Sequence, residues 1–142
     1  YAHPRNAFWP IIEALFDIPR LAPYARRLTL LQRRRIALWD VLQSCHRPGS
    51  LDSSITEETI VPNDFEQFFQ RHRQIQQVFF NGHKAEQSFN RHVAPRLSAP
   101  WNALPQQRLP STSPAHASLS LEEKLTQWHA VLEALSRADG PA

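Results

Sequence analysis

Apolar residues recur at spacings of three and four in several stretches of the chain, and this pattern predicts five helices. The first covers residues 7–16 and ends before Pro19. The second starts at Pro23, because proline is favoured at the first helical position, and ends at the basic residues 33–35, whose charges suit a helix C-terminus. The remaining helices are predicted at residues 63–69, 82–89 and 119–135.

Three short segments between these helices predict strands. Residues 36–42 form a mostly apolar run typical of a buried strand, residues 77–80 form a second run, and a brief strand is expected near residues 108–109. Alternating helices and strands indicate an α/β fold, because helices make the crossovers between parallel strands. We therefore expect a three-layer αβα sandwich with a small central parallel sheet, in a single domain covering residues 1–142.

The beginning of the chain departs from this alternation. No strand leads into the first helix, the sequence starts at Tyr1, and it contains no methionine. We expect a first strand and its following turn to precede Tyr1.

The composition is that of an ordinary globular protein, with 42% hydrophobic and 20% charged residues. No apolar run approaches the roughly 18 residues that a membrane-spanning helix needs, so we expect a cytoplasmic protein with no membrane partner. The single cysteine, Cys45, excludes an intramolecular disulfide and a cysteine-based cluster, and no histidine pair has the spacing of metal ligands. We expect a monomer without metal or cofactor, whose chemistry comes from ordinary side chains.

Arginine dominates the basic residues, because only Lys84 and Lys124 among the 16 are lysine. Guanidinium groups pair with phosphates and stack on bases, so this bias favours a nucleic-acid partner, although a GC-rich gene would produce it too. The net charge of +3 adds little to this choice. For the basic run 33–35, a solvated helix end is favoured over a binding patch.

A series of short motifs follows a fixed order along the chain. It contains AHPRNAFW at residues 2–9, LWDV at 38–41, RPGSLD at 47–52, PND at 62–64, FNG at 80–82 and LPSTSPA at 109–115. In these motifs and their spacing the sequence resembles the uracil-DNA glycosylase superfamily, and most closely its hypoxanthine-DNA glycosylase branch. The resemblance extends from Tyr1 to about Leu135. It implies the αβα fold of the superfamily and the removal of deaminated bases from DNA.

The resemblance assigns catalysis to the first motif. Asn6 matches the branch's catalytic asparagine and would hold the attacking water through its amide oxygen, with His3 nearby as a hydrogen-bond donor or proton carrier. Tyr1 matches the aromatic residue that stacks on a flipped base, and Asn81 matches the amide that reads the base. Without the resemblance, Asn6 is a helix N-cap, Tyr1 a chain terminus and Asn81 part of an Asn-Gly turn.

DNA contacts are expected from two loops. Hydroxyls and backbone N–H groups of Ser111, Thr112 and Ser113 suit phosphate oxygens, and Pro110 would stiffen their loop. The alternative for this loop is a surface linker rich in serine and proline. The other predicted contacts are Arg47, to a phosphate, and His116, to a phosphate or the leaving base.

Together these features predict a monofunctional DNA glycosylase of base excision repair, acting first on deoxyinosine and second on uracil in DNA. A bifunctional enzyme would need an amine nucleophile, and neither Lys84 nor Lys124 falls in a candidate site turn. The alternative is a non-catalytic DNA-binding relative with the same fold. A third hypothesis, an unrelated flavodoxin-like binding domain, predicts no DNA affinity at low salt.

Overall fold

The computed structural model describes residues 6–40, 42–44, 61–114 and 118–139. The chain divides into two compact units. One combines Tyr1–Leu38 with Leu109–Ala142, and we call it the terminal unit. The other is Trp39–Arg108, the central unit.

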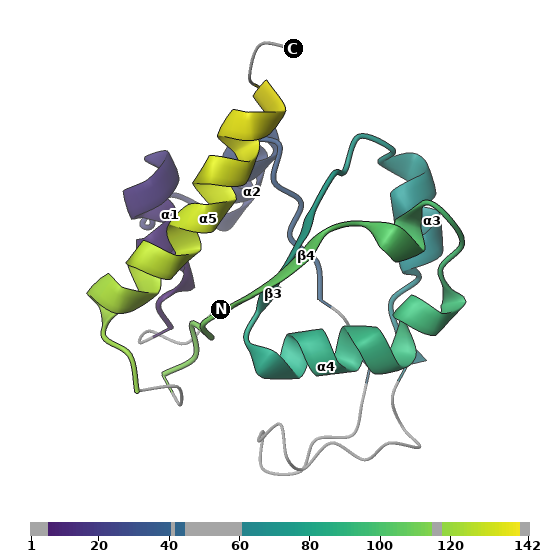
Figure 1. Ribbon diagram of the computed structural model, residues 1–142. Helices are drawn as coiled ribbons and strands as arrows, with labels where there is room; N and C mark the ends of the chain where they lie inside the picture. The colour runs from purple at the N-terminus through teal and green to yellow at the C-terminus, as the bar shows by residue number, and fades with distance from the viewer. Residues whose placement is uncertain (1–5, 41, 45–60, 115–117, 140–142) are drawn as a thin grey trace. The chain divides into compact units, whose positions relative to one another are not determined.

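The terminal unit contains three helices: α1 (Phe8–Phe16), α2 (Tyr24–Arg33) and α5 (Leu121–Asp139) (Figure 1). α1 packs against α5, where the rings of Phe8 and Trp128 meet edge to face with centroids 5.9 Å apart. Burying a large apolar side chain stabilises a fold by about 1.5–3 kcal/mol. The unit buries Phe8, Trp9, Ile11, Ile12, Phe16, Ile18, Leu31, Leu109 and Trp128.

Both N-terminal helices end at a residue in the left-handed conformation. α1 ends at Asp17, with φ 57°, whose N–H donates to the carbonyl of Glu13 at 2.9 Å. After α2, Arg35 has φ 62°, and the N–H of Ile36 returns to the carbonyl of Leu31 at 3.0 Å. This closing turn satisfies the last carbonyls of α2 and directs the chain away from the helix axis.

α5 begins with a capping box. The N–H of Ser120 donates to Oε1 of Glu123 at 3.0 Å, and the N–H of Glu123 donates to Oγ of Ser120 at 3.1 Å. Hydrogen bonds with the backbone and then the side chain of Ser120 lower the pKa of Glu123. In the same turn, Leu121 is 52% exposed and Lys124 only 6% exposed, so Lys124 lies on the buried face of α5 and Leu121 does not.

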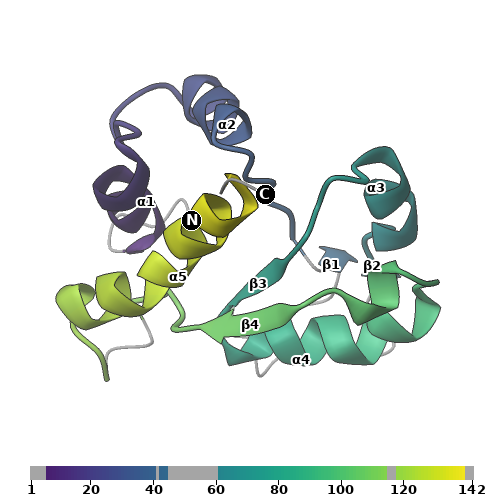
Figure 2. The same cartoon turned by 45° about the horizontal axis from the view of Figure 1, so that its top comes forward.

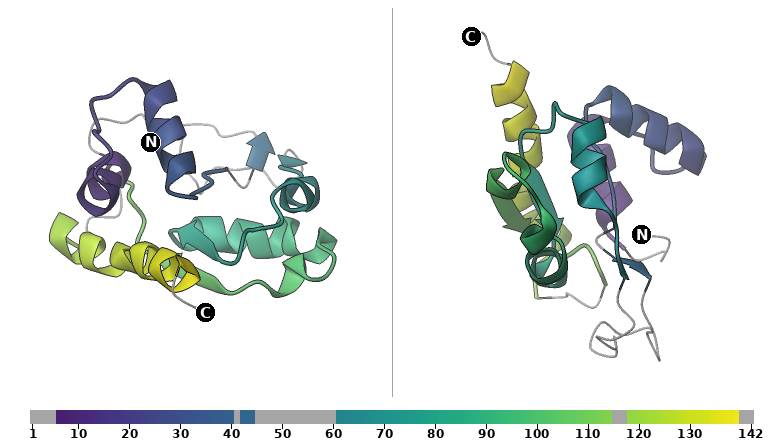
Figure 3. Two further views of the ribbon diagram at one scale, coloured as in Figure 1. Left: turned by 90° about the horizontal axis from the view of Figure 1, so that it is seen from above. Right: turned by 90° about the vertical axis from the view of Figure 1, so that its right-hand side faces the viewer.

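The central unit contains a two-stranded parallel sheet of β3 (Val78–Asn81) and β4 (Gln106–Leu109) (Figure 2). α4 (His83–His92) follows β3 directly and packs against it. Other elements are α3 (Phe65–Arg71) and two short 3₁₀ helices, Ala94–Arg96 and Trp101–Ala103. β1 (Leu42–Ser44) and β2 (Val61–Pro62) form a separate antiparallel pair (Figure 3).

Aromatic rings fill the core of the central unit. Phe69 of α3 stacks on Trp101, with centroids 5.6 Å apart and ring planes 14° apart. Phe89 of α4 meets Phe65 of α3 edge to face at 5.4 Å and Phe80 of β3 at 5.2 Å. These contacts hold α4 against β3, and thereby fix the turn between them that begins at the last residue of β3.

The predicted strand at residues 36–42 is wrong for most of its length. Residues 36–40 form no strand, and Leu42–Ser44 pairs antiparallel with β2. Trp39, the largest side chain of the run, stays 42% exposed, and its ring packs on that of Phe68 with centroids 4.3 Å apart. The parallel sheet in the described residues therefore has two strands, where three were predicted.

The α/β class with a small parallel sheet is confirmed, and all five predicted helices are present. This content is consistent with the αβα architecture that the motifs implied. Among the described residues, no helix combines the length and the apolar character needed to cross a membrane.

Candidate active site

Asn6 lies two residues before the first residue of α1, and its side chain bonds the start of this helix. Its side-chain oxygen Oδ1 accepts a hydrogen bond from the backbone N–H of Phe8 at 2.9 Å. An amide oxygen has a second lone pair, so this bond orients the side chain without exhausting its capacity as an acceptor. The N-cap of α1 is Ala7, so Asn6 lies one residue before the predicted cap position, and its bond to Phe8 would hold the amide in one position for chemistry.

A backbone hydrogen bond joins the start of α1 to the loop of residues 110–114. The N–H of Ala7 donates to the carbonyl of Thr112, with 2.9 Å between the atoms. This contact places the residue that follows Asn6 beside the serine-rich loop, although the two segments lie at opposite ends of the sequence. Two of the segments that the motifs selected are therefore neighbours within the terminal unit.

The loop is held at two further points. The indole Nε1–H of Trp128 in α5 donates to the carbonyl of Pro110 at 2.8 Å, and the N–H of Ser113 donates to Oγ of Ser111 at 3.1 Å. Thr112 is 1% exposed, whereas Ser111 and Ser113 are half-buried. We therefore expect Thr112 to fix the loop from inside, and the two serines to face a ligand.

Asn81 is the last residue of β3 in the central unit and is half-buried. It is followed by Gly82, whose φ of 94° lies in a region that favours glycine and which precedes the first turn of α4. The turn therefore needs the glycine for its backbone geometry.

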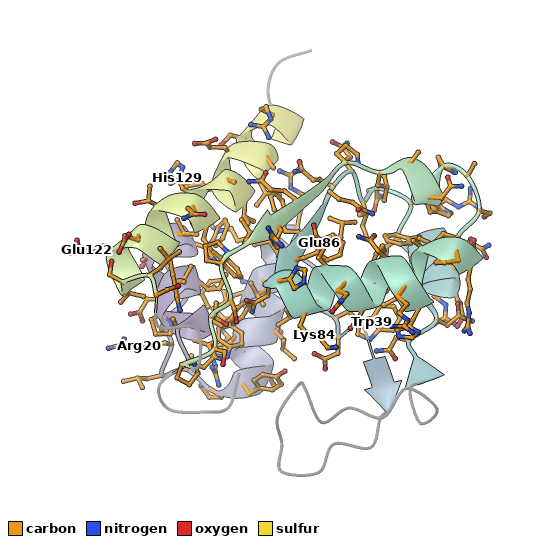
Figure 4. All side chains as sticks on the ribbon, turned by 60° about the horizontal axis from the view of Figure 1, so that its bottom comes forward. Arg20, Trp39, Lys84, Glu86, Glu122 and His129 are labelled. Carbon is orange, nitrogen blue, oxygen red and sulfur yellow. The ribbon has the colours of Figure 1, made fainter. Side chains whose placement is uncertain are left out.

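A small cluster of charges borders the beginning of α4. Arg108 of β4 lies 2.8 Å from Nδ1 of His83 and 3.6 Å from Oε1 of Glu86, measured from its Nη1. Figure 4 labels Glu86 and Lys84 on this helix. Exposed ion pairs contribute about 0–1 kcal/mol, so this cluster mainly fixes the orientation of Arg108 near the end of the sheet.

Lys124 is buried in the structure, although the sequence indicated no role for it. It is 6% exposed, and burial lowers its pKa. It lies four residues before Trp128, so both side chains project from one face of α5. The signal available in the sequence was this spacing within the helix predicted at residues 119–135.

The other predicted site residues, Tyr1, His3, Arg47 and His116, lie outside the described residues. Within the described part of the chain, no group of three or more His, Cys, Asp or Glu side chains could hold a metal ion.

Two curated proteins similar to this chain carry the same name. The chain is 32% identical to a hypoxanthine DNA glycosylase of Methanosarcina acetivorans over 132 residues, which cover 92% of this chain and 77% of that protein. It is 34% identical to a hypoxanthine DNA glycosylase of Methanosarcina barkeri over 87 residues, or 60% of this chain and 53% of that protein. No family model and no solved structure matches the sequence. With similarity over most of both chains in the first comparison, this protein belongs to the hypoxanthine DNA glycosylase family.

Proposed function

We propose that this protein is a monofunctional DNA glycosylase that flips a deaminated base out of DNA and hydrolyses its N-glycosidic bond. Hypoxanthine in deoxyinosine is the first substrate and uracil the second. The products are the free base and an abasic site. The enzyme acts as a monomer and without a cofactor.

One observation supports the catalytic part of this proposal most strongly. In a chain similar over 92% of its length to a protein named hypoxanthine DNA glycosylase, the hydrogen bond from Ala7 to Thr112 joins the Asn6 segment to the serine-rich loop. A glycosylase needs a group that positions water and a surface that holds the DNA strand close to it. Neighbouring segments of these two kinds meet both requirements in one place.

Asn6 is the residue that would position the water. The N–H of Phe8 occupies one lone pair of Oδ1, and the other lone pair can accept a hydrogen bond from water. Attack on C1′ forms the new C–O bond while the C1′–N9 bond breaks, and its electron pair leaves with hypoxanthine. The water loses a proton and the base gains one; His3 is the proposed proton carrier.

Asn81 would read the base, with Tyr1 stacked on it. The amide of Asn81 can donate to O6 of hypoxanthine and accept from its N1–H. It can likewise donate to O4 of uracil and accept from its N3–H. This shared donor and acceptor pattern supports activity on both bases. In this orientation the amide does not match adenine, whose exocyclic amine is a donor at the position of O6.

The serine-rich loop would press against the DNA strand beside the extruded nucleotide. Ser111 and Ser113 supply the hydroxyl groups, and the bond between Pro110 and Trp128 keeps the loop in place. Phosphate contacts of this neutral kind position the duplex without reading its sequence. Arg47 and His116 would add further contacts to the DNA.

The proposal is tested with a labelled duplex that contains a single deoxyinosine, under single-turnover conditions. We expect free hypoxanthine and a strand that breaks only after alkali treatment, slower release of uracil from a matched deoxyuridine duplex, and none of adenine. Binding without base release would favour a non-catalytic DNA-binding relative. Strand breakage before alkali treatment would show a lyase activity and contradict the monofunctional assignment.

A further inference from the structure

A cavity of about 260 Å³ lies in the terminal unit between the ends of α2 and α5. Figure 2 shows the C-terminal half of α5 beside the end of α2. The cavity is lined by Phe16, Arg33, Arg34, Arg35, Leu132, Leu135 and Ser136. Its described lining thus combines three cations and one hydroxyl with an apolar floor, and includes no carboxylate.

The helix end itself arranges the three arginines around this space. Arg35 takes the left-handed conformation that closes α2, and Arg34 donates from Nη2 to the carbonyl of Phe16 at 3.2 Å. In the described residues, Arg33 makes no ion pair or side-chain hydrogen bond. One guanidinium is therefore fixed to α1, and that of Arg33 can turn toward a ligand.

The charged residues of the segment that leads to the cavity are all positive. Residues 20–35 contain six arginines and no acidic residue. A solvated helix end would explain the arginines at the C-terminus of α2 but not the second wall that α5 places opposite them. Leu132 and Leu135 are half-buried and give that side an apolar wall, while the three arginines are exposed at the mouth.

We propose that this cavity binds a backbone phosphate of the DNA duplex, away from the nucleotide whose base is removed. The inference rests on the proposed function, because it requires DNA as the substrate. Guanidinium forks match the geometry of phosphate oxygens, and the hydroxyl of Ser136 supplies a further donor. The volume suits one phosphate group and its ordered water.

The position of the cavity predicts which phosphate it holds. α1 has 9 residues, with Asn6 just before its beginning and Phe16 of the cavity at its end. At 1.5 Å per residue the helix is about 13 Å long, which corresponds to about four steps of 3.4 Å along one DNA strand. The bound phosphate should therefore lie three to five nucleotides from the lesion.

The test measures DNA affinity as a function of salt for the whole protein and for the double variant Arg33→Gln with Arg35→Gln. Loss of one phosphate contact should lower the slope of log K against log salt by about 0.9. Arg20→Gln is the matched control, because Arg20 is exposed, pairs with Glu13 at 3.8 Å and does not line the cavity (Figure 4). Its slope should stay within about 0.3 of the parent value.

A second arm locates the phosphate. Substrates carrying one neutral methylphosphonate linkage at successive positions should lose affinity three to five nucleotides from the lesion with the parent protein, and lose nothing further there with the double variant. An equal slope in parent and double variant, or equal losses at that position, would overturn the proposal. Binding of inorganic phosphate without either DNA effect would also overturn it, since the cavity would then take a free anion only.

Hypoxanthine release at saturating DNA separates this inference from the proposed function. If the parent protein releases no base, the proposed function fails. The salt slopes of DNA binding still show whether the cavity holds a phosphate.

Discussion

The indole N–H of Trp128 donates to the carbonyl oxygen of Pro110, with 2.8 Å between the two atoms. Trp128 is 4% exposed and also contacts Phe8 at the start of α1. One side chain of α5 therefore supports both the serine-rich loop and the helix that Asn6 caps. The geometry proposed for the active site depends on this buried ring.

The variant Trp128→Phe should keep an aromatic ring but remove the donor to Pro110. A carbonyl left without its partner costs about 1–3 kcal/mol, so we expect a loss of this size in the free energy of unfolding, measured in urea. DNA affinity should fall as well, because the loop is released. Trp101→Phe in the central unit is the matched control and should destabilise the protein without this loss of affinity; equal affinities in both variants would contradict the role of the loop.

Replacing Ser111 and Ser113 together by alanine tests the contact of the loop with DNA. Binding to lesion and undamaged duplexes should weaken by similar factors, because phosphate contacts carry no sequence information. The salt slope should hardly change, since the hydroxyls are neutral. Fluorescence titrations at several salt concentrations measure both quantities, and unchanged affinity would make the loop a surface linker.

Burial of Lys124 predicts a dependence of stability on pH. Its pKa in the folded protein lies below the ordinary value of 10.5, so the unfolded chain binds more protons in the interval between the two values. The free energy of unfolding should therefore rise with pH across that interval. Lys124→Met should flatten this rise, and Arg137→Met, which removes an exposed cation from the same helix, should not; a persistent rise in Lys124→Met would exclude Lys124 as its source.

The local pattern of apolar residues was sufficient to predict the helices. Phe8, Ile11 and Ile12 recur at helical spacing and are buried in α1, and Pro23, predicted as the first residue of the second helix, is the N-cap residue before α2. Such elements follow from residues close in sequence, where spacing and capping decide the outcome. The cap predicted at Asn6 is displaced by one residue, because Ala7 is the N-cap and the Asn6 side chain accepts from the N–H of Phe8.

Features that depend on distant residues could not be predicted in this way. On periodicity alone, an apolar run such as residues 36–42 fits a strand as well as any other buried segment. Only the fold shows that Trp39 of this run packs on Phe68 of α3. The burial of Lys124 and the bond from Ala7 to Thr112 need the fold, because their surroundings come from other parts of the chain. The motifs identified the segments, and the structure shows that two of them lie together.

Asn81→Asp tests how the base is read. A carboxylate offers no donor to O6 of hypoxanthine or O4 of uracil, and a lost hydrogen bond with its partner unpaired costs about 1–3 kcal/mol. We expect single-turnover release of the two bases to fall by different factors, because their rings place the acceptor differently. Small and equal losses would identify Asn81 as a residue of the turn only.

The most direct measurement of the central claim compares single-turnover release of hypoxanthine by Asn6→Ala and Asn6→Ser. Alanine removes both the cap and the amide oxygen, whereas serine keeps a side-chain acceptor for the cap and removes only the amide. If Asn6 positions the attacking water, both variants should lose at least about 100-fold in rate, while their affinities for lesion DNA stay within a few-fold of the parent. Release by Asn6→Ser near the parent rate would show that Asn6 only caps α1 and would contradict the proposed mechanism.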